Sequence, residues 1–276
     1  MILRMFLFEV RYWLRQPMVY IFFFILALLT FGATSSEAVT IGGGVGNVLK
    51  NAPFVVYPFY GIFSFLALLM VTAFVNGTAI RDFANNTSQI VFSTPVSKPA
   101  YLVGKFLGSA FVASLPLLGV SLGIVLGSAM PWVDPLRVGP NLLYAHAQGF
   151  LIIGLPNILF TAAIIFAVGV LQRSTMASFI TAIVLFVGYS IAGSLMEDME
   201  NQRIASMLDP FGATALGEMT QYWTVDQKNH AAVPFHGLVL WNRVLWIGVA
   251  AAIFLFGSLR FSFSDRKQKA AAQQAD

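Results

Sequence analysis

The chain has 276 residues, of which 58% are hydrophobic and only 10% are charged. A soluble domain usually carries about 25% charged residues, so we expect lipid rather than water to be the solvent for much of this chain. There is no cysteine, which excludes disulfides, a thiol nucleophile and a thiolate metal site. The net charge of +4 does not indicate nucleic-acid binding, because no polar segment combines a basic run with stacking aromatic residues.

The first sixteen residues predict an amphipathic helix that lies in the inner interface of the membrane. On a helical wheel Arg4, Arg11 and Arg15 share one side, and Trp13 belongs to the apolar side. The arginines would then face anionic headgroups. Pro17 would end this helix, and the chain would turn into the bilayer after it. A cleaved signal peptide is the alternative, although a glutamate and bulky aromatic residues do not suit one.

Six mainly apolar stretches follow, each long enough to cross a bilayer. Near the outer end of the last stretch, the side chain of Arg243 is expected to reach the headgroups. The sequence therefore predicts an all-α polytopic membrane protein, with a six-span domain over residues 1–265 and a flexible cytoplasmic tail over 266–276. The expected spans are 18–34, 54–79, 102–128, 143–171, 175–195 and 238–260.

The basic residues indicate how the chain is oriented. With the N-terminus inside, the inner segments hold eleven of the sixteen lysine and arginine residues, and the outer loops hold five. Eight of the twelve acidic residues lie on the outer side. Because cytoplasmic loops are enriched in lysine and arginine, the sequence predicts that both ends of the chain are cytoplasmic.

The sequence offers no convincing catalytic or energy-converting site. The central parts of the six spans contain no Asp, Glu, Lys or Arg, whereas ion-coupled transporters generally keep ionisable groups there. The glycine run at 42–46 lacks the Gly-Lys-Ser/Thr of a Walker A loop, and the three histidines show no metal-ligand spacing. We therefore expect no cofactor on this chain, and an intramembrane enzyme is disfavoured.

The third span carries Gly119, Gly123 and Gly127 in consecutive steps of four residues. Small residues on one face of a helix let another helix approach closely. The partner helix could belong to the same bundle or to a second protomer. Pro116 and Pro156 are expected to kink the third and fourth spans.

Several segments carry a resemblance to a known family. The inner loop contains Arg81-Asp82-Phe83, then IVFSTPVSK at 90–98 and YLVGK at 101–105. The start at 8–17 and the run NRVLW at 242–246 belong to the same pattern. With the six-span layout, these segments resemble the class 2 (ABC-2-type) ABC transporter permeases over nearly the whole chain. Some relatives continue into a second permease half and a zinc aminopeptidase-like domain, of which this sequence contains nothing.

The resemblance implies that the chain is the permease subunit of an ATP-driven exporter in the inner membrane of a bacterial cell. Two six-span units, identical or paralogous, would pair around a pathway. Each would dock a separate ATPase subunit, which would hold ATP and Mg. The inner loop would couple the two subunits, with an apolar anchor at 90–92 and a turn stiffened by Pro95. The implied coupling residues are Arg81, Asp82, Ile90, Val91, Phe92, Thr94 and Pro95.

Two alternatives stay open at the level of sequence. The apolar run at 90–92 could simply contact the membrane interface. The whole chain could also be a non-transporting scaffold or assembly factor, although a scaffold has no need of a stiff, aromatic-tipped inner loop. The substrate and the role of the outer loop at 197–235 do not follow from the residues.

Overall fold

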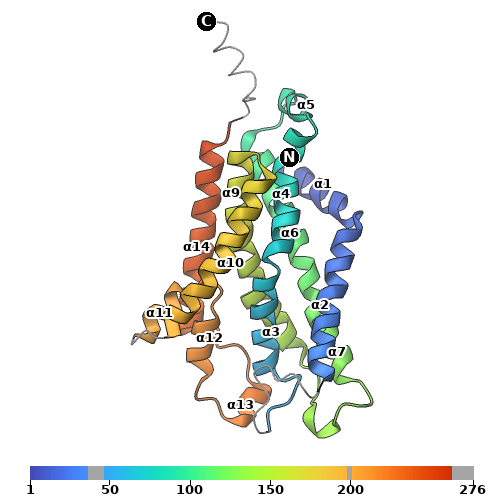
Figure 1. Cartoon of the computed structure of the whole chain (residues 1–276), viewed down its shortest axis with the longest axis vertical. Helices are drawn as coiled ribbons and strands as arrows, with labels where there is room; N and C mark the ends of the chain where they lie inside the picture. Colours follow the sequence, from blue (N-terminus) through green and yellow to red (C-terminus); the bar gives the residue numbers. More distant parts are fainter. Residues whose placement is uncertain (37–46, 198–200, 263–276) are drawn as a thin grey trace, which may run out of the picture.

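The computed structural model describes residues 1–36, 47–197 and 201–262, and this part of the chain forms helices without a strand (Figure 1). The glycine run at 42–46 and the predicted tail at 266–276 lie outside the described residues. The helices are α1 (Ile2–Leu14), α2 (Pro17–Ser35), α3 (Pro53–Leu66), α4 (Leu68–Ala84), α5 (Ser88–Ser93), α6 (Lys98–Ser114), η1 (Leu115–Leu117), α7 (Leu118–Ser128), η2 (Pro135–Arg137), α8 (Leu143–Gln148), η3 (Gly149–Gly154), α9 (Leu155–Gln172), α10 (Thr175–Glu197), α11 (Gln202–Leu208), α12 (Ala213–Thr220), α13 (Val225–His230) and α14 (Gly237–Arg260).

Five helices in the described part of the chain are long and apolar enough to cross a membrane, and the α3–α4 pair adds a sixth if its two bent halves count as one span. The all-α polytopic fold predicted from the sequence is therefore confirmed. An even number of crossings returns the chain to its starting side. In Figure 1 the N-terminus and the last turn of α14 lie at the same end of the molecule.

Three spans are interrupted along their length. The third span passes from α6 to α7 through a short 3₁₀ turn that contains Pro116. In the fourth, a π-helical segment precedes α9, and Pro156 lies in the first turn of α9. Both breaks lie at or next to a proline, which lacks the N–H that would continue the helix, but each of these two spans still counts as one helix, and the predicted kinks stay a prediction. The 51° bend of the second span at Ala67 was not predicted, since no proline stands there.

Burial separates the central spans from the peripheral ones. The spans at 98–128 and 143–172 are mostly buried, whereas α2, α10 and α14 leave most of their residues exposed. Exposed apolar helices of a membrane protein face lipid or another protein chain. Figure 1 shows α1 and α5 at one end of the bundle and α11, α12 and α13 at the other. The positive-inside pattern predicts that the α1 and α5 end is the cytoplasmic one, and we call it the inner end.

Candidate functional site

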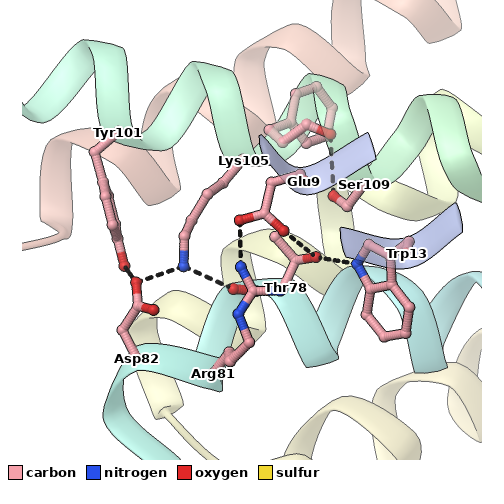
Figure 2. A network of polar contacts seen from close by, with 9 residues as sticks. Glu9, Trp13, Thr78, Arg81, Asp82, Tyr101, Lys105 and Ser109 are labelled. Atoms are coloured by element: carbon pink, nitrogen blue, oxygen red, sulfur yellow. Dashed lines mark hydrogen bonds and ion pairs between the residues drawn. The ribbon is translucent and has the colours of Figure 1, made fainter. Parts of the chain in front are cut away.

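The inner end of the bundle, where α1 and α5 lie, contains two buried ion pairs (Figure 2). Arg81 in α4 lies 2.5 Å from the carboxylate of Glu9 in α1, and Lys105 in α6 lies 2.6 Å from Asp82 in α4. The side chain of Glu9 is completely buried, and that of Lys105 is 2% exposed. Buried charges require partners, because removal from water costs several kcal/mol per ion. The two pairs therefore fix the relative positions of α1, α4 and α6.

Thr78 in α4 links the two ion pairs. Its hydroxyl donates to Glu9 at 3.3 Å and accepts a hydrogen bond from the indole N–H of Trp13 at 2.7 Å. Its backbone carbonyl accepts from Lys105 Nζ at 3.0 Å. Figure 2 shows these side chains converging from three helices. Hydrogen bonds through Thr78 join the two pairs into one connected polar network, in which one guanidinium nitrogen of Arg81, Nη1, is buried without a hydrogen-bond partner.

Aromatic rings close this network toward the surface. The guanidinium of Arg81 lies 4.2 Å from the ring centroid of Tyr12, and the Tyr101 hydroxyl donates to Asp82 at 2.7 Å. Cation–π contacts stabilise a positive charge where water is largely excluded. We call the complete set the inner charge network, and it consists of Glu9, Tyr12, Trp13, Thr78, Arg81, Asp82, Tyr101 and Lys105.

Residues 85–97 form an elbow between α4 and α6, and we call this segment, which includes α5, the inner elbow. Ile90 is 68% exposed at its surface, and Pro95 is also exposed. Phe92 instead packs inward, with ring centroids 5.8 Å from both Phe83 and Tyr101. Because Tyr101 also bonds to Asp82, the elbow is attached directly to the inner charge network.

The structure divides the predicted coupling residues into two groups. Arg81 and Asp82 lie in the last turns of α4, since that helix continues to Ala84, and their side chains point into the bundle. They were predicted to belong to the loop surface, and this placement is wrong. Val91 and Phe92 are half-buried, so the apolar anchor is reduced to one exposed side chain. The exposed members of the predicted set are Ile90, Thr94 and Pro95.

The N-terminal helix also differs from its prediction. Arg4, Arg11 and Arg15 are exposed, as a helix facing headgroups requires. Trp13, however, is 8% exposed and bonded to Thr78, and the face of α1 that carries Glu9 packs on α6. Gly104 and Gly108 of α6 make this approach possible, because a Cβ at either position would collide with α1. The helix is therefore docked on the bundle rather than held by lipid alone.

The glycines of the third span contact α2 of the same chain. A Cβ at Gly119, Gly123 or Gly127 would lie within 3.0 Å of atoms in α2. The carbonyl oxygens of Phe23 and Ala27 line this contact. Of the two partners considered for the glycine stripe, the structure therefore shows the one within the bundle.

A second polar cluster lies in the outer half of the bundle. Arg243 donates to Asn242 Oδ1 from two nitrogens and to Asn157 Oδ1 at 2.8 Å, and it is only 4% exposed. The amide of Asn242 donates to the carbonyls of Ser206 and Asp209 at 2.6 and 2.8 Å. The prediction that Arg243 extends to the headgroups is therefore wrong. Its hydrogen-bond partners are instead the buried amides of Asn242, the preceding residue of α14, and of Asn157 in α9.

Sequence reasoning missed the central members of the inner charge network. Glu9 and Lys105 were assigned to the inner side without a structural role, and Thr78 was not noticed at all. One signal was available, because Glu9 is the only acid among the first sixteen residues and Arg81 and Lys105 flank spans that otherwise lack charge. An isolated charge on an apolar helix face indicates a partner within the protein.

The described residues contain no group of acidic or histidine side chains that could hold a metal ion.

A model of the ABC-2 family transporter proteins matches residues 35–260 of the chain. The chain belongs to this family. No curated protein matches it. ABC-2 proteins are the membrane components of ABC transporters, so this chain is the permease subunit of such a transporter. The match includes α4, the inner elbow and α6, whereas α1 with Glu9 precedes it. The exposed inner elbow of this ABC-2 permease therefore lies inside the matched region, whereas α1, which pairs with α4 through Glu9, lies before it.

Proposed function

We propose that this ABC-2 permease is the membrane half of an exporter and docks a separate ATPase subunit at the inner elbow. The observation that carries the proposal is the exposed side chain of Ile90 on a segment whose other apolar residues are anchored in the bundle. An exposed aliphatic side chain on a firmly held support suits a groove on a partner protein. ATP and Mg would be bound by that partner.

The inner charge network supports a coupling role for the same region. A force on the elbow reaches α6 through Tyr101 and α4 through Phe83, because Phe92 contacts both rings. The pair of Glu9 with Arg81 then transmits the displacement to α1. Packed elements of this kind move as units rather than deform continuously. ATP-driven closure of two docked ATPases would thus shift three helices of each permease together.

The remaining features of the proposal follow the resemblance to ABC-2 permeases. The chain would pair with a second copy or a paralogue in the inner membrane of a bacterial cell, and transport would run outward. The exposed apolar surfaces of α2, α10 and α14 provide area for such a partner as well as for lipid. A relationship to the aminopeptidase-fused permeases is part of the same proposal.

The proposal is tested by isolating the tagged chain from native membranes in mild detergent and identifying bound proteins by mass spectrometry. We expect an ATPase with a Walker A sequence in a near-equal amount, and its loss in Ile90→Glu. Leu136→Glu is the matched control, because Leu136 is an 86% exposed leucine in the connection that follows α7 on the outer side. A preparation without an ATPase would favour the scaffold function. An ATPase that is retained by Ile90→Glu would refute docking at the elbow.

A further inference from the structure

A cavity of about 400 Å³ lies in the outer half of the molecule between α3, α10 and α12. Its walls are almost entirely apolar, with Phe54, Ile62 and Phe65 from α3 and Leu216 from α12 among the lining residues. Its volume is within the range of small-molecule sites, which extends from about 300 to 1,000 Å³. The inner charge network and the elbow are not part of it.

The residues that line the cavity are spread along the whole length of α3. It is lined by Phe54 in the first turn of α3 and by Leu66 at the last residue of the helix. The helix has 14 residues, which corresponds to a length of about 21 Å. The hydrocarbon layer of one leaflet is about 15 Å thick. The lining residues therefore extend over a length comparable with the thickness of one leaflet, and we call this cavity the slot.

One side of the slot opens to lipid and the other is rigid. Ile62 and Leu66 line the slot and are also 44% and 48% exposed on the surface of the bundle. On the opposite side the ring of Phe65 stacks on Phe186 at 4.7 Å and meets Phe211 at 5.1 Å. A preformed apolar slot with a lateral opening suits a flexible hydrocarbon chain that enters from the membrane.

A cation lies at the outer end of the slot. The ammonium of Lys228 in α13 is 4.8 Å from the ring centroid of Phe54, which itself lines the slot. The two acids near Lys228 in the sequence have other partners, since Asp226 pairs with His230 and Glu218 accepts from Gln221. Within the described part of the chain, no carboxylate pairs with Lys228. Its charge is therefore available to an anionic group outside the hydrocarbon layer.

We propose that the slot binds one alkyl chain of an amphiphile, with the anionic head of that molecule at Lys228. This proposal extends beyond ATPase docking, because occupation of the slot needs neither ATP nor a partner subunit. The chemistry fits both an anionic membrane lipid and an amphiphilic substrate, and only the second source rests on the proposed export function.

Two glycines make a sharp test possible. Gly217 of α12 lines the slot, and a Cβ built there meets no other atom within 4 Å. Gly217→Leu therefore places a side chain at the slot without a collision in the backbone. Gly248 of α14 is the matched control, because it is also exposed and helical and its Cβ likewise meets nothing within 4 Å. Both variants replace helical glycine by leucine, so their effects on helix stability should be similar.

The probe is palmitic acid with a diazirine near the end of its chain, added to the purified permease in phosphatidylcholine nanodiscs without ATP. After illumination, labelled peptides are identified by mass spectrometry. We expect saturable labelling of α3 that falls about tenfold in Gly217→Leu and is unchanged in Gly248→Leu, because the leucine excludes several methylene groups. Equal labelling of both variants, or uniform labelling of all exposed helices, would overturn the proposal.

The head group and its source are tested in two further arms. Lys228→Gln should weaken labelling by the palmitic acid probe about fivefold but leave labelling by the corresponding neutral alcohol unchanged. An equal effect on both probes would refute the role of Lys228. In phosphatidylglycerol nanodiscs, lower labelling identifies an anionic lipid as the occupant, whereas unchanged labelling identifies an exchangeable substrate. Loss of ATPase docking affects none of these results, so failure of the two proposals can be told apart.

Discussion

The carboxylate of Glu9 in α1 and the guanidinium of Arg81 in α4 form an ion pair of 2.5 Å that joins two segments 72 residues apart. The Glu9 side chain has no exposure to solvent. Arg81 lies about one helical turn before the inner elbow along α4. The pair therefore connects the N-terminal helix to the segment proposed to bind the ATPase. The pair is therefore a direct link between α1 and the helix that leads into the inner elbow.

Glu9→Gln should destabilise the permease substantially. The substitution removes the ion-pair partner of Arg81, which is 12% exposed, and breaking a largely buried pair typically costs about 3 kcal/mol or more. We expect a clear drop in the melting temperature followed by tryptophan fluorescence in detergent, since Trp13 reports on the same contact. Arg4→Gln on the exposed side of α1 is the control and should change the melting temperature little. Equal effects of the two variants would show that the ion pair carries no stability.

The pair of Lys105 and Asp82 should behave as one unit in a double-mutant cycle. Lys105→Met leaves Asp82 with the Tyr101 hydroxyl as its remaining buried donor, and Asp82→Asn leaves Lys105 without its counter-charge. We expect each single variant to be less stable than the double variant, with a coupling energy of about 1–3 kcal/mol. Denaturation midpoints of the four proteins in one detergent provide the measurement. Additive effects would contradict direct pairing.

Two residues of the inner elbow, Phe92 and Ile90, should differ in how much they contribute to the stability of the permease. Phe92 packs on Phe83 and Tyr101, so Phe92→Ala should lower the free energy of unfolding by about 2 kcal/mol. Ile90 is 68% exposed, and Ile90→Ala should leave the melting temperature within about 1 °C, as for most exposed sites. Thermal unfolding of the isolated permease checks both. A large destabilisation by Ile90→Ala would mean that the elbow packs differently.

The general architecture could be predicted because it follows from composition. Six apolar stretches and a basic inner side follow from the membrane as solvent, and the prolines at two helix breaks act on the local backbone, so each is visible in a short window of sequence. The segment proposed to dock the ATPase could be singled out from the sequence, because the run at 90–98 is continuous in the chain. Its exposed and buried faces were not separated, since α5 has only six residues and its orientation depends on Phe83, Tyr101 and Phe261.

The inner charge network could not be predicted because its members are distant in the sequence. Lys105 appeared to belong to a loop, yet it becomes buried once α6 begins at Lys98 and α4 continues past Asp82. Arg243 appeared to be near the surface, and only the folded outer helices bring Asn157 and the carbonyl of Asp209 into its cluster. In both cases a charge close to a span boundary was assigned to water, whereas tertiary hydrogen bonds keep it inside.

The glycine stripe predicts opposite effects for two Gly→Ala substitutions. A Cβ at Gly123 would collide with the Thr30 hydroxyl and the Ala27 carbonyl, so Gly123→Ala should force α7 away from α2 at a cost of about 1–3 kcal/mol. Gly32 in α2 has no atom within 4 Å of its Cβ position, and Gly32→Ala should be neutral or stabilise the helix by up to about 1 kcal/mol. Unfolding midpoints of the two variants provide the test. A neutral Gly123→Ala would show that the α2 contact is loose.

The outer cluster should depend on the forked shape of the Arg243 side chain rather than on its charge alone. Its guanidinium binds Asn242 and Asn157 simultaneously, and Asn157 in turn donates to Ser64 in α3 at 2.7 Å. A lysine has one compact ammonium and cannot bind both amides in this geometry. Arg243→Lys should therefore leave a buried amide oxygen without a donor and cost about 2 kcal/mol.

Arg260→Lys, at the exposed inner end of the same helix, is the matched control and should be nearly neutral. The melting temperatures of the two variants in detergent are compared. The Asn242 amide also donates to the carbonyls of Ser206 and Asp209. Hydrogen exchange of the amides in α11 should therefore rise in Arg243→Lys alone. Unchanged exchange in α11 would show that Arg243 and the outer helices are independent.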